Sequence, residues 1–138
     1  MKKSIACIAF RGREVLIAHR IQKGQMGGRW EFPGGKVENG ESDEDACKRE
    51  FFEEFGEEIV VKEKIASAIF KHAGEEVLLC AYLITVPHDG SEKKYVLSEH
   101  TEYKWVSLSE IPTLHFVDSD MLIYPEIAKY LATVLQEG

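Results

Sequence analysis

The stretch GGKVENGESDEDACKREFFEEFG, residues 34–56, opens as a glycine-rich turn and continues as a segment crowded with carboxylates. Ser42 and Asp45 fit a capping box, in which a side chain accepts a hydrogen bond from the main chain three residues later, so we expect a helix to begin near Asp43. Gly56 suits the left-handed conformation that often follows a helix, so we expect the helix to end near Phe55. The stretch therefore predicts one helix over residues 43–55.

Two neighbouring arcs of this helix differ in chemistry. At about 100° per residue, one apolar arc consists of Cys47, Phe51, Phe52 and Phe55. The neighbouring acidic arc consists of Glu50, Glu53 and Glu54. Like charges at this spacing repel each other, and a bound cation would relieve the repulsion. Carboxylate oxygens suit Mg²⁺ or Mn²⁺ far better than Zn²⁺.

A solvated acidic helix face is the simpler interpretation of this charge pattern. Two features favour a ligand site. Arg49 lies inside the acidic cluster, where its guanidinium can orient a carboxylate. The apolar run before the helix breaks at Gly34 and Gly35, where the absence of a side chain lets the backbone approach a ligand or metal closely. A charged surface of a structural protein and a metal site are thus both consistent with the residues.

The spacing of these residues resembles the Nudix box, G-x5-E-x7-R-E-U-x-E-E-x-G-U, where U is a bulky apolar residue. The matching positions are Gly35, Glu41, Arg49, Glu50, Phe51, Glu53, Glu54 and Gly56. The last position departs from the pattern, because Glu57 stands where an apolar residue is usual, and we expect Ile59 to supply the packing. The run GGRWEFPGGKVENGE further resembles the MutT-like branch of the Nudix hydrolases.

This resemblance implies an α/β fold, an α/β/α sandwich around a mixed β-sheet, in a single domain over residues 1–138. Apolar and β-branched patterns predict strands at 4–10, 15–21, 58–72, 76–86 and 104–106, with 76–86 central and 58–72 long or bent. Trp30 and Phe32 are expected to pack in the core rather than against a base. A last helix is expected over 124–136, with Pro125 in its first turn. Its predicted apolar stripe is Ile127, Tyr130, Leu131, Val134 and Leu135.

The resemblance also implies hydrolysis of a nucleoside diphosphate linked to another group. It assigns Mg²⁺, or alternatively Mn²⁺, to the carboxylates of Glu50, Glu53 and Glu54 and to the carbonyl of Gly35. Arg49 is expected to orient one of these carboxylates, with Glu41 supporting the loop or an outer metal shell. The base that deprotonates the attacking water is either Glu50 or Glu99, with Glu102 an alternative to Glu99.

Substrate contacts are expected from other elements. Arg20 ends a predicted strand and suits a phosphate through its planar fork, although a surface ion pair is an alternative. Lys36 is a second candidate for phosphate contact. The MutT-like branch implies a nucleoside triphosphate cleaved to the monophosphate and pyrophosphate, with 8-oxo-dGTP the expected substrate. The base would be read near the last helix by Asp120, with Phe116 and Asp118 in reach.

Other substrates stay open at this point. An aspartate at position 120 replaces the asparagine expected in MutT itself and changes the donor and acceptor pattern, so a pyrimidine triphosphate such as CTP or dCTP is an alternative. Nucleotide sugars and dinucleoside polyphosphates are others, as is a nucleotide-binding module without catalysis. The intact Arg49-Glu50 and Glu53-Glu54 pairs argue against loss of catalysis.

The net charge and the apolar content limit the classes of partner that the protein is expected to bind. A net charge of −7 over 138 residues argues against a nucleic-acid polymer or an anionic membrane as partner, and no apolar run reaches the length needed to span a bilayer. The negative net charge does not argue against a nucleotide as ligand, because a bound metal reverses the local charge. Cys7, Cys47 and Cys80 lie in apolar settings and predict buried free thiols in a reducing, cytoplasmic compartment. The sequence leaves monomer and homodimer open.

Overall fold

The computed structural model describes residues 1–20, 28–86 and 100–137. Its described strands are β1 (Lys2–Arg11), β2 (Glu14–Arg20), β3 (Trp30–Glu31), β4 (Gly34–Lys36), β5 (Val60–His72), β6 (Glu75–Thr85) and β7 (His100–Ser107). The helices are α1 (Asp43–Phe55), the 3-10 helix η1 (Leu108–Thr113) and α2 (Asp118–Glu137). The boundaries of α1 are those that its capping residues predicted.

One mixed sheet organises the chain. Its main path runs β3-β2-β1-β6-β5, with β4 paired to β1 and β7 paired to β2. β1 and β6 are parallel, and the other pairs are antiparallel. β6 lies between β1 and β5, which confirms its central place. β5 carries two register shifts between Val61 and Ala66, so the prediction of a long or bent strand is confirmed.

The pairing along one edge of β1 explains why the glycine turn lies beside α1. β2 pairs with β1 only at Phe10 and Arg11, next to the hairpin turn. The same edge, nearer the start of β1, pairs instead with β4, where Ile5 is opposite Gly35. β4 therefore takes the place that β2 leaves, and the chain passes from it directly into the loop that precedes α1.

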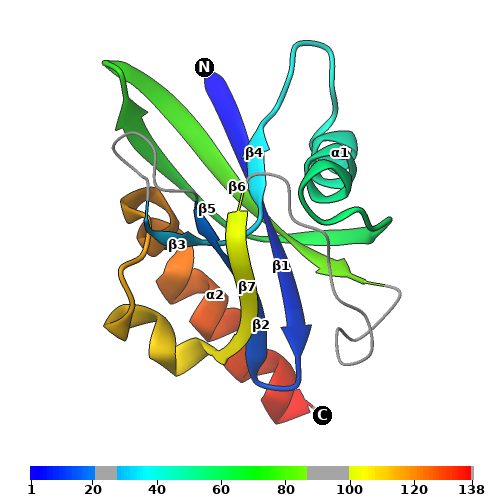
Figure 1. Cartoon of the computed structure of the whole chain (residues 1–138), viewed down its shortest axis with the longest axis vertical. Coiled ribbons are helices and arrows are strands. Elements are labelled where there is room, and N and C mark those ends of the chain that lie inside the picture. The colour runs from blue at the N-terminus through cyan, green and yellow to red at the C-terminus, as the bar shows by residue number, and fades with distance from the viewer. Residues whose placement is uncertain (21–27, 87–99, 138) are drawn as a thin grey trace.

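The two long helices cover opposite faces of the sheet, which confirms the α/β/α sandwich (Figure 1). On the α1 side, Cys47, Phe51 and Phe55 pack with the buried side chains of Ile5 and Ile84. On the α2 side, the buried core includes Phe32, Phe116, Ile123, Ile127 and Leu131. Phe32 therefore packs in the core as expected. Trp30 is half-buried and packs against this core cluster.

The last helix differs from its prediction. α2 begins at Asp118, and Pro125 lies inside it. Proline removes one main-chain donor from a helix interior, but the apolar face on both sides of Pro125 is buried in the core, with Ile123 and Ile127 each 0% exposed. The predicted stripe was wrong at its end, because Val134 and Leu135 are 41% and 37% exposed.

The structure also tests several smaller expectations about burial and about the strands. Phe52 belongs to the predicted apolar arc but is 56% exposed, because α1 turns Cys47, Phe51 and Phe55 toward the sheet and leaves Phe52 at the rim. The short strands β3 and β4 were not predicted, and β7 extends well beyond 104–106. Cys7, Cys47 and Cys80 are buried free thiols, as expected. None of the described helices is long and apolar enough to span a membrane.

Candidate functional site

α1 is held at both ends, so its acidic face has a fixed orientation. The hydroxyl of Ser42 accepts a hydrogen bond from the Asp45 N–H at 3.1 Å. At the other end, Gly56 has a φ of 70°, and its N–H donates to the Phe52 carbonyl at 2.8 Å. The carboxylate of Asp43 accepts a hydrogen bond from the Tyr82 hydroxyl of β6, which ties the start of the helix to the sheet.

Arg49 links α1 to the loop that precedes it. Its guanidinium grips Glu41 with two parallel bonds, from Nε to Oε2 at 2.7 Å and from Nη2 to Oε1 at 3.0 Å. Glu41 also accepts from the Glu38 N–H at 3.0 Å. The hydrogen bonds from Arg49, then the one from Glu38, lower the pKa of Glu41 from 4.5 to about 2. Glu41 therefore supports the loop, as one of its two expected roles requires.

The same guanidinium reaches the acidic face. Its Nη1 donates to Glu50 Oε1 at 2.9 Å and to Glu53 Oε2 at 3.4 Å. Its Nη2 donates to the main-chain carbonyl of Lys36 at 2.9 Å. The hydrogen bonds and charges of Glu41, and then those of Glu50, raise the pKa of Arg49 above its ordinary value. One permanently charged side chain thus sets the geometry of two acidic side chains and of β4.

The glycine turn is packed against the acidic side chains. A Cβ at position 35 would lie 2.5 Å from the Cδ of Glu50, so only glycine lets that carboxylate lie against the strand. The Gly34 N–H donates to Glu54 Oε1 at 3.4 Å. Gly34 has a φ of +154°, and a Cβ there would lie 2.1 Å from the Ile5 carbonyl oxygen. Gly34 is therefore required for the close approach of β4 to β1, and Gly35 leaves room for the Glu50 carboxylate where it lies in this structure.

The three glutamates of the acidic face differ in exposure. Glu54 is 2% exposed, whereas the side chains of Glu50 and Glu53 are 15% and 57% exposed. In the described part of the chain, no three Asp, Glu, His or Cys side chains are already arranged as a metal-binding group. The donor set nevertheless fits Mg²⁺, because it offers hard carboxylate oxygens beside the Gly35 backbone, in a space that a Cβ would fill.

The residues predicted to read the base separate into two kinds. Asp120 is 7% exposed, and its Oδ2 accepts from the Phe32 N–H at 2.9 Å. Phe116 is 5% exposed and packs edge-on against Phe32 with ring centres 5.1 Å apart, so its side chain belongs to the core in this structure. Asp118 has a side chain that is 84% exposed and pairs with Arg29 at 3.2 Å.

The predicted phosphate contacts and the predicted bases are only partly covered by the described residues. The side chain of Lys36 is at an exposed position at the end of β4. Arg20 ends β2, and its side chain lies outside the described part of the structure. Glu99 also lies outside the described residues. Glu102, the alternative base, is 60% exposed and lies 3.8 Å from the Nδ1 of His19.

Three interactions near the predicted base-reading residues were not foreseen. Lys104 of β7 places its ammonium 4.4 Å from the ring centre of Trp30, and the His19 ring lies 4.8 Å from the same indole. The pairing of Arg29 with Asp118 was also missed. The sequence carries no signal for any of them, because β2, β3, β7 and α2 meet only in the folded chain.

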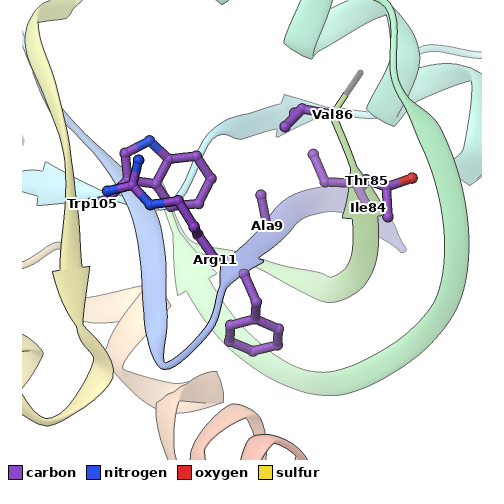
Figure 2. A pocket seen from close by; sticks show the side chains of 7 residues that line it. Ala9, Arg11, Ile84, Thr85, Val86 and Trp105 are labelled. Atoms are coloured by element: carbon purple, nitrogen blue, oxygen red, sulfur yellow. The ribbon is translucent and has the colours of Figure 1, made fainter. Parts of the chain in front are cut away.

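Two cavities are lined by residues other than Glu50, Glu53 and Glu54. One, of about 300 Å³, is lined by the ends of β1 and β6 and by Trp105 of β7. Figure 2 shows the Arg11 side chain reaching the Trp105 ring, over which the guanidinium lies 4.7 Å from the centre. The other, of about 530 Å³, is lined by Lys48, Arg49 and Phe52 of α1 and by Glu58 and Ile59, which follow the helix.

Comparisons with known proteins agree with the geometry. The NUDIX domain family matches residues 1–125. The CTP pyrophosphohydrolase of Escherichia coli K12 is 36% identical over 110 residues, covering 80% of this chain and 78% of that protein. The 8-oxo-dGTP diphosphatase of Proteus vulgaris is 37% identical over 91 residues, covering 66% and 65%. The solution structure of the E. coli ORF135 protein has a TM-score of 0.81 at 31% identity, covering 96% of this chain and 92% of that one.

Proposed function

Because the chain belongs to the Nudix family, as a MutT-like hydrolase of phosphoric anhydride bonds, we propose that it cleaves a nucleoside triphosphate to the monophosphate and pyrophosphate. The observation that carries the proposal is the Arg49 network, which joins Glu50 and Glu53 on one face of α1 to Glu41 in the preceding loop, beside a backbone without side chains at Gly34 and Gly35. This arrangement presents oxygen ligands to a cation in the way that pyrophosphate chemistry needs.

The residues that would hold Mg²⁺ are Glu50, Glu53, Glu54 and the carbonyl of Gly35. When bound, the cation would neutralise the charge of the phosphate oxygens and lower the pKa of the attacking water. Glu54 is 2% exposed and is fixed by the Gly34 amide, so it would give the site a rigid inner ligand. Glu53, with its side chain 57% exposed, would be free to adjust when substrate and cation arrive.

Other side chains of the site would position these ligands and the substrate. Arg49 would orient Glu50 and Glu53 through its hydrogen bonds, and Glu41 holds Arg49 in place from the other side. Either Glu50 or Glu99 would accept the proton from water. Lys36 and Arg20 would contact the phosphates, since the guanidinium of Arg49 is already bonded to glutamates.

For the substrate, we propose an oxidised purine triphosphate of the 8-oxo-dGTP type, which would make the protein a nucleotide-pool sanitiser. The Proteus relative is named for this activity. CTP or dCTP is the specific alternative, because the E. coli relative is named a CTP pyrophosphohydrolase and because Asp120 lacks the amide of an asparagine. Asp120 and Asp118, at the start of α2, would face the base.

Wider features of the protein follow from the same proposal. Residues 1–138 would form one hydrolase domain acting on a small-molecule nucleotide, as a monomer or a homodimer. The three buried free thiols support a reducing compartment such as the cytoplasm.

Release of pyrophosphate from a panel of nucleotides with Mg²⁺ tests the proposal. The panel would contain 8-oxo-dGTP, the ordinary nucleoside triphosphates, ADP-ribose, a nucleotide sugar and a dinucleoside polyphosphate. We expect the highest kcat/KM for 8-oxo-dGTP, and a preference for CTP or dCTP would select the alternative. Activity restricted to the diphosphate-linked compounds would reject the triphosphate assignment, and no activity with either Mg²⁺ or Mn²⁺ would favour a binding module.

A further inference from the structure

A short parallel bridge connects the start of α2 to the strand that precedes the glycine turn. It pairs Trp30 with Phe116. Its two hydrogen bonds run from the Trp30 N–H to the His115 carbonyl at 2.8 Å and from the Val117 N–H to the Trp30 carbonyl at 2.9 Å. This is the regular alternation of a parallel ladder, in which one residue bonds to the two neighbours of its partner.

The next bond of that ladder is replaced by a side chain. A continuing ladder would run from the Phe32 N–H to the Val117 carbonyl. That carbonyl instead accepts from the N–H groups of Asp120 at 3.1 Å and Met121 at 3.2 Å, because the chain turns into α2. The Phe32 N–H is bonded to Asp120 Oδ2 at 2.9 Å. The Asp120 carboxylate therefore takes the place of the missing carbonyl.

The residue that receives this bond is close to the acidic face along the chain. Pro33 follows Phe32, and its carbonyl accepts from the Cys7 N–H at 2.7 Å. Gly34 comes next and donates to Glu54, and Gly35 lies directly against the Glu50 carboxylate. Only Pro33 thus separates Phe32, whose amide Asp120 holds, from Gly34, whose amide contacts Glu54 of the acidic face.

We propose that Asp120 is a positioning residue for hydrolysis, which fixes the glycine turn against the acidic face of α1 through the amide of Phe32. This proposal rests on the proposed function. It assigns Asp120 a role apart from reading the base, because one of its two oxygens is committed to the main chain. A displaced glycine turn would move both the Gly35 carbonyl and the space in which Glu50 lies.

The proposal predicts that an acceptor atom, rather than a charge, is needed at this position. Asp120→Asn keeps an oxygen for the Phe32 N–H, whereas Asp120→Ala removes it. We expect Asp120→Ala to lower kcat about tenfold on every nucleotide that the wild type hydrolyses, whatever its base, since small misplacements of a site reduce the chemical step strongly. Asp120→Asn is expected to keep kcat within about threefold and to change KM in a base-dependent way.

A matched control exists on the same helix. Glu126 of α2 also accepts a hydrogen bond from a strand amide, that of Ser67 in β5, at 3.2 Å. Glu126→Ala removes the same kind of contact from a strand at the far edge of the sheet, so kcat should be unchanged. A loss of kcat in Glu126→Ala equal to that in Asp120→Ala would show that loosening α2 is sufficient, and would overturn the proposal.

A second readout separates this proposal from the proposed function. Hydrogen exchange of the Phe32 amide, measured by NMR, should be slow in the wild type and Asp120→Asn and at least tenfold faster in Asp120→Ala. If the wild type hydrolyses no nucleotide, the proposed function fails and the exchange rates still decide whether Asp120 holds the turn. Unchanged exchange in Asp120→Ala, or an effect on KM alone, would overturn the positioning role. If Asp120→Ala does not fold, loss of kcat in Asp120→Asn would overturn it.

Discussion

The acidic helix and the start of α2 both carry residues that we propose for the site, but the chain encodes them differently. α1 is specified by neighbours in sequence, since Ser42 and Gly56 cap it and Arg49 contacts Glu50 and Glu53 within one turn. The start of α2 depends on β3, because Asp120 bonds to Phe32 over a separation of 88 residues. A local pattern can therefore reveal the first region, whereas the second becomes visible only in the fold.

The largest effect is expected in the locally encoded region. Glu53→Gln should lower kcat by about two orders of magnitude or more while leaving Tm nearly unchanged, because it removes one ligand charge with little change in shape. Steady-state kinetics with Mg²⁺ and thermal unfolding would measure both. Glu44→Gln, on the exposed part of the same helix where Glu44 pairs with Lys48, serves as the control and should retain full activity. Near-normal turnover in Glu53→Gln would contradict the metal assignment.

The glycine turn joins the two regions, and Gly34→Ala should damage it severely. The added Cβ would meet the Ile5 carbonyl oxygen at 2.1 Å, in a backbone that cannot move without breaking the pairing of β4 with β1. We expect a loss of about 3 kcal/mol in the free energy of unfolding, measured by urea denaturation. Gly12→Ala, at a φ of +62° with no atom within 4 Å, should lose only about 1 kcal/mol. Equal losses in the two variants would refute the steric argument.

A smaller and pH-dependent effect is expected from Glu41→Gln. The pKa of Glu41 is lowered from 4.5 to about 2 in the folded protein, mainly by Arg49, so its ionised form stabilises the fold above pH 4.5. This contribution is lost as the pH falls from 4.5 through about 2. The Tm of the wild type should exceed that of Glu41→Gln near pH 6, and the difference should shrink toward pH 2. A difference that is constant over this range would show that the Arg49–Glu41 pair does not stabilise the fold.

The smallest effect should come from Phe52, at the rim of α1. Phe52 is 56% exposed, so Phe52→Ser should change the free energy of unfolding by no more than about 0.5 kcal/mol. Phe51 is 0% exposed and stacks on Phe55 at 4.6 Å, and Phe51→Ala should lose about 3 kcal/mol or more. Comparable losses in the two variants, measured by chemical denaturation, would mean that the exposed face of α1 is covered in solution.

These two regions also define what the sequence could predict. The capping residues predicted the limits of α1, and the position of Arg49 predicted that its guanidinium would orient a carboxylate of the acidic face. Pro125 led to a start of α2 that was six residues too late, because the burial of Ile123 and Ile127 outweighs the missing proline donor. The exposure of Phe52 and the bond between Asp120 and Phe32 depend on how helices lie on the sheet, which no local pattern records.

The resemblance to the Nudix box identified the family, whereas the contacts of the individual residues indicate how the site could bind a ligand. The carboxylate cluster by itself was compatible with a charged surface. The contacts of Arg49 and the space that glycine leaves at position 35 favour a ligand site, since a surface face would not require glycine there. The substrate is the least determined feature, because the residues at the start of α2 acquire their roles from tertiary contacts.

The most direct test is phosphorus NMR of 8-oxo-dGTP hydrolysis by the wild type and Glu53→Gln, with increasing Mg²⁺. The account predicts that the wild type forms the monophosphate and pyrophosphate only when Mg²⁺ is present, and that Glu53→Gln forms both at least about a hundredfold more slowly. Release of orthophosphate, turnover without a divalent cation, or equal rates in the two proteins would contradict the claim that the acidic face of α1 is a metal-dependent pyrophosphohydrolase site.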